Sequence, residues 1–366
     1  MIKIGYVDDE VDESVTGAKH YQDQLSSEEI ECELISPPKW EQFDNLVNEK
    51  YDLFLIDYEL DKVQSDDKRV DYRGTTLTAE IRARLPDYPI VLITRESILD
   101  HLNRQTRRQL SERRQVCDEL ILKSDLDNKP DDTQQLLISL ANGFSNLRNA
   151  ADNTWKSLVK LLGADEEETD FLREAAPPLP EGKWIVTEAA DWVRNVVLKF
   201  PSILYDPIHA ATRLGISLNS FWNNKVQGTI EPAKYTGIFA PSEGRWWKGR
   251  LFRVAKELAM EKDINGPINQ AFAKAFHEEY SIELSPAICV WDKTPIADWV
   301  CYILRKPVKL RNSLRYYPDS RPSIMDPARV SFRAIRESNA FEEELLDAEG
   351  IKLLEKIETL SEPSKS

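Results

Sequence analysis

The sequence predicts a doubly wound, five-stranded parallel α/β domain at the amino end, followed by a mainly α-helical second part. Within the first 150 residues, short continuous apolar runs alternate with helix-like segments, a pattern typical of parallel strands covered on both faces. The remainder differs in composition, since eight of the nine tryptophans lie after residue 150. Twelve of the fifteen net negative charges lie within residues 1–150, so the composition changes between two parts of the chain.

The strands and helices of the first part follow from hydrophobic periodicity. The predicted strands are 3–7, 31–35, 52–56, 89–94 and 120–123. The predicted helices are 12–26, 40–50, 75–85, 97–114 and one that begins near Asp131. In sheets of this class, ligands bind beyond the carboxyl ends of the strands.

Polar residues end four of the predicted strands at that edge. They are Asp8 and Asp9, Asp57, Thr94 and Lys123. Three carboxylates in close quarters repel one another, and an all-oxygen site with open positions suits Mg²⁺. A lysine and a hydroxyl opposite the metal hold an oxyanion, while the central carboxylate is able to attack a phosphoryl group and form an acyl phosphate.

Residues 1–146 resemble the receiver domain of bacterial two-component response regulators, which has a flavodoxin-like fold. The matching pieces, in order at strand ends, are Val7-Asp8-Asp9-Glu10, Leu55-Ile56-Asp57, Ile93-Thr94 and Leu122-Lys123. The resemblance implies that Asp57 is the phosphoacceptor and that Thr94 and Lys123 contact the phosphoryl group. The implied Mg²⁺ ligands are Asp8, Asp9, Asp57 and the backbone carbonyl of Glu59. A histidine kinase or phosphotransfer protein is the implied donor.

Some positions depart from the family pattern. Leu60 to Gly74 forms a long charged segment, which either shields the site, recognises a partner or is a solvated insertion. Arg95 stands where a small residue is usual, so it either pairs with the phosphoryl group or hinders access to it. Leu120 replaces an aromatic residue that often reports phosphorylation, and Ser124 replaces a common proline.

Arginines crowd the segment predicted as the fourth helix, in an otherwise acidic domain. They are Arg104, Arg107, Arg108, Arg113 and Arg114. The first three share one helical face by their spacing. This stripe docks either an acidic partner or the chain's own acidic segments, or it is a solvated face.

The connector carries apolar residues at heptad-like spacing from Leu137 to Leu161, which predicts that the last receiver helix continues past the domain edge. The stripe is either a homodimer contact through the 137–161 helix or ordinary packing. Acidic residues and a proline-rich run follow. The predicted domains are 1–146 (receiver), 147–183 (helical connector and acidic, proline-rich linker) and 184–366 (helical, Trp-rich output domain).

Residues 184–366 are predicted to be mainly helical, and we assign them to no family. The predicted helices are 187–199, 207–214, 218–226, 247–261, 266–278, 294–304, 327–337 and 340–360, with 287–291 as the best strand. Residues 207–226 resemble a helix-turn-helix, with Gly215 at the turn and Ser217 as a cap; the alternative is a structural helix pair. The first reading implies a DNA-binding transcriptional regulator, with Asn219 and Asn223 exposed to bases.

Other features of the second part are less specific. The run from Arg245 to Arg250, with further basic residues up to Arg321, forms either an anion-binding surface or a basic rim around a Trp-filled core. The acids Asp292, Asp298, Asp319 and Asp326 have no regular metal-ligand spacing. With no nucleophile–base pair or phosphate loop, we expect no enzymatic chemistry beyond phosphoryl acceptance and self-dephosphorylation.

The composition also limits location and partners. The four cysteines form no CxxC pair, which favours reduced thiols in a cytoplasmic protein. No stretch approaches the ~20 apolar residues of a membrane helix, and no secretory leader is predicted. The sequence therefore predicts a Mg²⁺-dependent, cytoplasmic signalling phosphoprotein of the two-component phosphorelay type.

Overall fold

The computed structural model describes residues 1–11, 17–61, 70–101, 117–174, 176, 182–318, 322 and 325–359. The chain divides into two compact units. Unit 1 comprises Met1–Leu162, Pro177–Arg194 and Gly237–Ser242, and unit 2 comprises Gly163–Ala176, Asn195–Thr236 and Glu243–Ser366. The chain therefore passes from one unit to the other five times. The units are described separately below.

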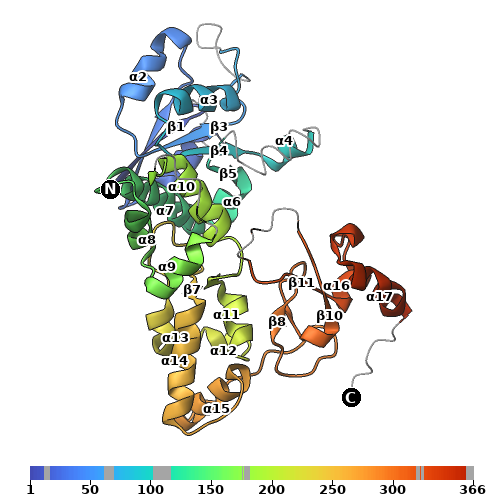
Figure 1. Ribbon diagram of the computed structural model, residues 1–366. Helices are drawn as coiled ribbons and strands as arrows, with labels where there is room; N and C mark the ends of the chain where they lie inside the picture. Colours follow the sequence, from blue (N-terminus) through green and yellow to red (C-terminus); the bar gives the residue numbers. More distant parts are fainter. Residues whose placement is uncertain are drawn as a thin grey trace. The chain divides into compact units, whose positions relative to one another are not determined.

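Unit 1 is built on the parallel sheet that the sequence predicts (Figure 1). Its strands are β1 (Ile2–Val7), β2 (Ile30–Ile35), β3 (Leu53–Asp57), β4 (Ile90–Thr94) and β5 (Glu119–Leu122). They lie in the order β2-β1-β3-β4-β5, and every neighbouring pair is parallel. This is the flavodoxin-like strand order, so the predicted fold is confirmed. β3 and β4 are buried along their whole length, which explains their continuous apolar sequences.

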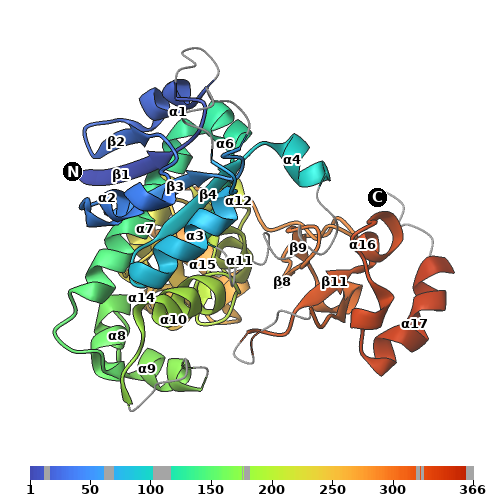
Figure 2. The ribbon, with the colours of Figure 1, turned by 90° about the horizontal axis from the view of Figure 1, so that it is seen from above.

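Helices cover both faces of this sheet. They are α1 (Ala18–Leu25), η1 (Trp40–Gln42), α2 (Phe43–Asn48), α3 (Gly74–Arg84), α4 (Glu96–His101), α6 (Lys123–Asn128) and α7 (Pro130–Arg148). Figure 2 shows α1 and α6 on one side of the strands and α2 and α3 on the other. Phe43 and Leu77, from α2 and α3, pack with Phe54 and Leu92 of the sheet in one hydrophobic cluster. The arginines between 104 and 114 lie outside the described residues, as does most of the segment between Leu60 and Gly74.

The predicted continuation of the last receiver helix is wrong. Helix α7 ends at Arg148, and the chain turns before α8 (Trp155–Leu162). Asp152 favours this break because its carboxylate accepts hydrogen bonds from the backbone N–H and the hydroxyl of Thr154. The apolar stripe on α7 and α8 is buried within unit 1 itself: Leu137, Leu140, Phe144, Leu147 and Leu158 are each at most 1% exposed.

Two later segments of the chain complete unit 1 against α7. Helix α10 (Val186–Trp192) packs on α7, and Phe239 lies edge-on to Phe144 with ring centroids 5.7 Å apart. Gly143 makes this approach possible, since a Cβ there would lie 2.2 Å from the Phe239 ring. The stripe is thus covered by this chain's own residues, and we do not propose a homodimer through the 137–161 segment.

Unit 2 is rich in helices, as predicted, with short antiparallel strand pairs between them. Its helices are α9 (Glu166–Arg173), α11 (Pro207–Arg213), α12 (Leu218–Phe221), α13 (Asn224–Ile230), η4 (Glu231–Ala233), α14 (Lys248–Glu261), α15 (Ile268–Tyr280), η5 (Leu310–Asn312), α16 (Phe332–Glu337), η6 (Glu343–Leu345) and α17 (Ala348–Thr359). A π-helical turn, Val193–Val197, spans the border with unit 1. The strands are β6 (Leu204–Tyr205), β7 (Trp246–Trp247), β8 (Trp299–Val300), β9 (Pro307–Val308), β10 (Ser313–Arg315) and β11 (Arg329–Ser331).

Two hydrophobic cores support unit 2. One gathers around α11 to α15 and includes Phe221, Trp246 and Phe272. The other lies around β8 to β11 and the last helices and includes Trp291, Val308 and Val330. Among the described residues, no helix is long and apolar enough to cross a membrane.

Several predicted elements of unit 2 are wrong. The predicted helix 327–337 begins with the strand β11, and its helical part, α16, starts only at Phe332. Residues 287–291 form a turn and one isolated bridge, between Ile288 and Pro295, and not a strand. Residues 294–304 contain the two-residue strand β8 in place of a helix. Lys293 and Ile296 have φ of 57° and 62°, in the left-handed region, which interrupts a right-handed helix there.

Candidate functional site

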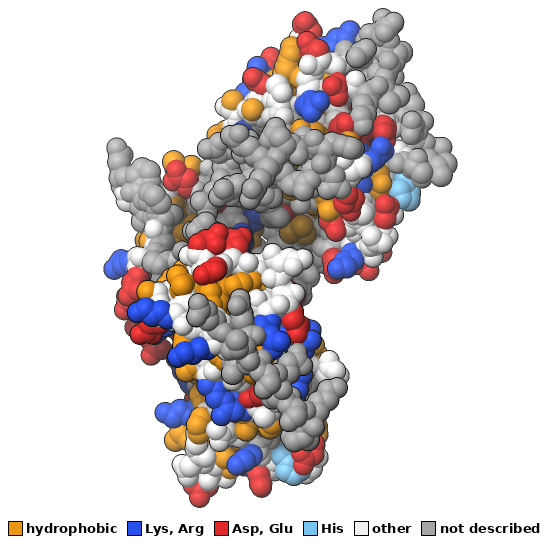
Figure 3. Space-filling model, turned by 90° about the vertical axis from the view of Figure 1, so that its right-hand side faces the viewer, with side chains coloured by type: hydrophobic (Ala, Val, Ile, Leu, Met, Phe, Trp, Pro, Cys, Tyr) orange, Lys and Arg blue, Asp and Glu red, His pale blue; other side chains and the backbone are white. Residues whose placement is uncertain are grey.

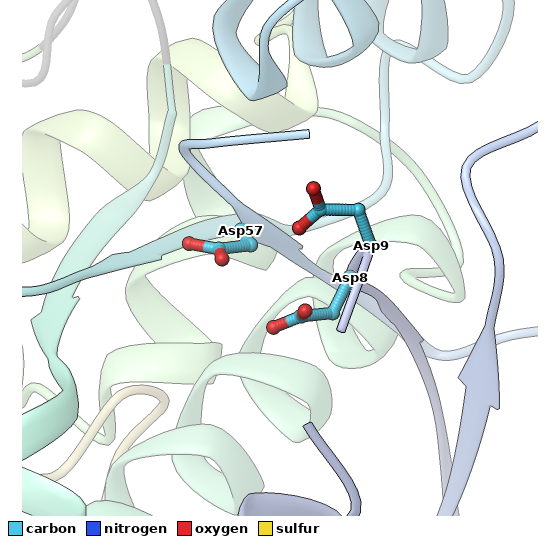
Figure 4. Close-up of side chains that lie close together, drawn as sticks. All are labelled: Asp8, Asp9 and Asp57. Atoms are coloured by element: carbon cyan, nitrogen blue, oxygen red, sulfur yellow. The ribbon is translucent and has the colours of Figure 1, made fainter. Parts of the chain in front are cut away.

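The three predicted carboxylates meet at the carboxyl edge of the unit 1 sheet. Asp8 and Asp9 follow β1, and Asp57 is the last residue of β3 (Figure 4). One carboxylate oxygen from each residue lies within 4.8 Å of the others, and all three residues are buried. The register of the sheet brings them together. Val7 pairs with Ile56 in the parallel β1–β3 ladder, and Asp8 and Asp57 directly follow these two residues.

Lys123 and Tyr6 bind this acidic cluster directly. The Lys123 Nζ lies 2.9 Å from Asp57 Oδ2 and 3.2 Å from Asp8 Oδ2, and its side chain is 4% exposed. The Tyr6 hydroxyl donates a 2.6 Å hydrogen bond to Asp8 Oδ2. The carboxylates of Asp8 and Asp57 thus hold the Lys123 ammonium, and the Tyr6 hydroxyl also holds the Asp8 carboxylate.

The electrostatics of the cluster are unbalanced. Burial and the neighbouring charge of Asp8 raise the pKa of Asp57 to about 8, although Lys123 opposes this. Burial acts to lower the pKa of Lys123, but Asp57 and Asp8 outweigh it and raise that pKa. Three carboxylates face one ammonium, so a bound cation would relieve their repulsion. The donors are all oxygens and include no thiolate or imidazole, which fits Mg²⁺.

Thr94 and Glu59 stand beside this cluster. Thr94 ends β4, is 1% exposed, and its hydroxyl has no hydrogen-bond partner among the described residues. A buried, unpaired hydroxyl is costly unless a ligand satisfies it. Glu59 is partly exposed and lies two residues beyond Asp57.

Helix α3 begins directly against the central carboxylate residue. The Gly74 N–H donates to the Tyr58 carbonyl at 3.0 Å, and a Cβ on Gly74 would lie 2.0 Å from the Asp57 carbonyl oxygen. A glycine is therefore required at the start of α3, and it holds the backbone that follows Asp57 in place.

Two contacts at the edge of this site were not predicted from the sequence. The Arg95 guanidinium binds both carboxylate oxygens of Glu10, and the Ser124 hydroxyl donates to the carboxylate of Glu96. Tyr6 was also missed, although strand alternation supplies a signal for it. Tyr6 lies in β1 and Asp8 follows the strand directly, and in extended backbone residues two apart point to the same side.

The predicted helix-turn-helix is only partly formed. Helix α11, Gly215 with φ of 77° and the Ser217 cap of α12 are present. The expected second helix over 218–226 is wrong, because α12 ends at Phe221 and Asn223 caps the separate helix α13. Asn219 is exposed, but it lies on a helix of four residues.

The basic residues of unit 2 are largely engaged by its own acids and carbonyls. Arg250 binds Glu168, Lys248 binds Asp326, and Arg305 binds Asp206. Trp246 and Trp247 beside them are each 1% exposed. On the face drawn in Figure 3, the coloured Lys and Arg side chains are interspersed with acidic ones. These pairs favour the reading of a basic rim around a Trp-filled core.

The irregular set of acids in unit 2 does not gather into a site. Asp292 binds Thr294 and Asn312, Asp298 accepts from the Leu310 N–H, and Asp319 lies outside the described residues. Among the described residues, only Asp8, Asp9 and Asp57 form an acidic group suited to a metal ion.

Comparisons with known proteins find similarity among solved structures. No family model and no curated protein matches the chain. The solved structures to which it is similar include receiver domains. A CheY-like receiver domain protein from Methanospirillum hungatei is 19% identical, covers 40% of this chain and 97% of its own, and gives a TM-score of 0.28.

Two further solved structures share this similarity. The response regulator TrrA from Thermotoga maritima, in complex with Mg²⁺-BeF, is 23% identical; the match covers 38% of this chain and 99% of TrrA, with a TM-score of 0.27. The response regulator RcsB from Salmonella typhimurium is 18% identical; the match covers 53% of this chain and 84% of RcsB, with a TM-score of 0.28. At these identities the likeness concerns the fold alone.

Proposed function

We propose that this chain is a response-regulator-like signalling protein that accepts a phosphoryl group on Asp57 from a histidine kinase or phosphotransfer protein. The observation that carries the proposal is the buried group of Asp8, Asp9 and Asp57, with Lys123 Nζ 2.9 Å from Asp57, at the carboxyl edge of the sheet. Buried acidic side chains gathered together need a cation, and the resulting charge arrangement suits a phosphoryl group.

The proposed transfer is a single displacement at phosphorus. A carboxylate oxygen of Asp57 attacks, a P–O bond forms, and the P–N bond to the donor's imidazole breaks; the imidazole keeps the electron pair and takes up a proton. Lys123 and the unpartnered hydroxyl of Thr94 bind the phosphoryl oxygens. In self-dephosphorylation, water attacks phosphorus and the P–O bond to Asp57 breaks, which releases inorganic phosphate and restores the carboxylate.

The metal ligands of this proposal are Asp8, Asp9, Asp57 and the backbone carbonyl of Glu59. When bound there, Mg²⁺ supplies positive charge that neutralises the phosphoryl oxygens. Asp8 and Asp57 also hold Lys123, so the same carboxylates that bind the metal orient the ammonium.

We further propose that the part of residues 184–366 that belongs to unit 2 forms the output domain and acts by binding a partner protein, in the cytoplasm. The four cysteines are buried as thiols, which suits a reducing compartment. The short helix α12 and the paired basic residues of unit 2 do not favour DNA as the partner.

The test is phosphorylation of the purified full chain by Mg²⁺ and acetyl phosphate. We expect one acid-labile, hydroxylamine-sensitive phosphate per chain, which is absent without Mg²⁺ and absent in Asp57→Asn. Asp71→Asn is the matched control, since Asp71 is exposed and lies outside the acidic cluster. Equal labelling of wild type and Asp57→Asn, or none in wild type, contradicts the proposal.

A further inference from the structure

Glu10 and Arg95 form an ion pair between two loops that carry the site. Glu10 directly follows Asp9, and Arg95 directly follows Thr94. The Arg95 Nη2 lies 2.9 Å and 3.1 Å from the two carboxylate oxygens of Glu10. The Glu10 N–H also donates to Asp8 Oδ1 at 2.8 Å, so the backbone of Glu10 is held by the acidic cluster.

Arg95 lies within the electrostatic reach of Asp57. Burial acts to lower the pKa of Arg95, but the charge of Glu10 and, to a smaller extent, that of Asp57 raise it. The side chain of Arg95 is 42% exposed and that of Glu10 is 11% exposed. Arg95 is therefore a cation at the edge of the site, on a side chain with room to move.

The two cations near Asp57 differ in what holds them. Lys123 is buried and bound by two carboxylates of the cluster. Arg95 is bound by one carboxylate outside the cluster, and its side chain is 42% exposed, whereas that of Lys123 is 4% exposed. Arg95 therefore leaves its partner at lower cost than Lys123 does.

We propose that Arg95 exchanges Glu10 for the phosphoryl oxygens of phosphorylated Asp57, and that Glu10 is the competitor that holds it in the unphosphorylated state. This inference rests on the proposed function. A phosphoryl group adds about two negative charges and three acceptor oxygens. A guanidinium binds such a group with two parallel hydrogen bonds.

The exchange has two consequences of opposite sign. When Arg95 contacts the phosphoryl oxygens, it stabilises the acyl phosphate and shields phosphorus from water. Removal of the Arg95 guanidinium therefore weakens phosphoryl binding and shortens the lifetime of the acyl phosphate. Loss of the Glu10 charge frees Arg95 and strengthens binding. Because Glu10 acts through Arg95, its substitution has no such effect once Arg95 is gone.

The experiment uses the full chain at saturating Mg²⁺, with two readouts. One is the affinity for beryllofluoride, measured by calorimetry, and the other is the half-life of phosphate placed on Asp57 with acetyl phosphate. We expect Arg95→Gln to weaken beryllofluoride binding about tenfold and to shorten the half-life. The affinity of Arg95→Lys for beryllofluoride should lie between those of wild type and Arg95→Gln. Glu10→Gln should bind beryllofluoride more tightly than wild type.

The controls separate this inference from the proposed function. Arg84→Gln removes an exposed ion pair with Asp44 and should match wild type. If wild type accepts phosphate but Arg95→Gln keeps its affinity and half-life, the exchange is overturned and the proposed function stands. The double variant combines Glu10→Gln with Arg95→Gln. If Glu10→Gln strengthens beryllofluoride binding both in wild type and in the Arg95→Gln background, Glu10 does not act through Arg95. If wild type accepts neither phosphate nor beryllofluoride, both proposals fail.

Discussion

Arg194 binds Glu119, 75 residues earlier in the chain, through a 2.6 Å contact between Nη2 and Oε2. Its Nη1 also donates to the Asp118 carbonyl at 2.7 Å, and both side chains of the ion pair are about nine-tenths buried. The turn after α10 is therefore attached to β5, the strand that leads directly into Lys123.

The first prediction concerns this ion pair. Glu119→Gln should lower the free energy of unfolding by about 3 kcal/mol, because it leaves a buried guanidinium without its counter-charge. Urea denaturation followed by circular dichroism measures the change. The double variant with Arg194→Met should be more stable than Glu119→Gln alone; additive losses would show that the two charges do not interact.

The second prediction concerns Asp57 without metal. Because the pKa of Asp57 is raised to about 8 in the folded chain, the folded state binds a proton that the unfolded state has lost above about pH 4. The charge of Asp57 thus lowers stability progressively as the pH rises toward 8. In EDTA, Asp57→Asn should melt several degrees above wild type at pH 8, since ~1 kcal/mol corresponds to ~2–4 °C.

The same difference should shrink at pH 5 and when Mg²⁺ is added to wild type. Asp71→Asn, on the exposed surface, should show neither effect. A variant less stable than wild type at pH 8 would mean that the Lys123 contact outweighs the repulsion among the carboxylates.

The third prediction concerns Gly143 in α7. Gly143→Ala should destabilise the chain by about 1–3 kcal/mol, because the new Cβ would lie 2.2 Å from the Phe239 ring. Gly228→Ala is the control. Gly228 lies in α13 with nothing within 4 Å of an added Cβ, so this substitution should stabilise the chain by about 0.5–1 kcal/mol. Thermal unfolding distinguishes the two signs, and a stabilising Gly143→Ala would exclude close packing by Phe239.

The fourth prediction concerns Asp206, which caps α11 and contacts His209 and Arg305. Burial acts to raise the pKa of Asp206, but its hydrogen bond to His209 and the nearby charges hold that pKa well below its usual range. Its contribution is therefore present above about pH 4 and is lost as the pH falls through the lower, folded-state value.

Asp206→Asn should accordingly be less stable than wild type at pH 7, and the difference should diminish near pH 2. Asparagine is also a good cap, so this variant isolates the effect of the charge. Asp206→Ala removes the cap as well and should cost about 1 kcal/mol more in denaturant unfolding. A constant difference from pH 7 to 2 would rule out the charge as its origin.

Much of unit 1 was predictable because its strands are buried on both faces. Runs such as Leu53–Ile56 and Ile90–Ile93 have no alternation and end in polar residues, so they indicate both the sheet and its functional edge. In unit 2, the apolar run at 287–291 is buried except at Ile288, yet it forms turns and not a strand. Burial alone does not fix backbone conformation, and the positive φ at Ile296 depends on tertiary packing that a single sequence does not express.

The site itself was predictable only as far as strand ends determine it. Asp8, Asp9, Asp57 and Lys123 converge because parallel strands share one edge. The pairing of Glu10 with Arg95 depends on how two loops approach each other, which hydrophobic periodicity does not describe. The break after Arg148 did have a local signal, since Asp152 and Thr154 form a turn motif that competes with a continuous helix.

The segment around Phe239 affects the order in which parts of this chain are able to fold during synthesis. Unit 1 includes Gly237–Ser242, which leave the ribosome after residues 195–236 of unit 2. Domains usually fold as they emerge, amino end first. Here α7 keeps an open apolar face until the chain has been made to about residue 242, so the nascent protein exposes that face throughout the intervening translation.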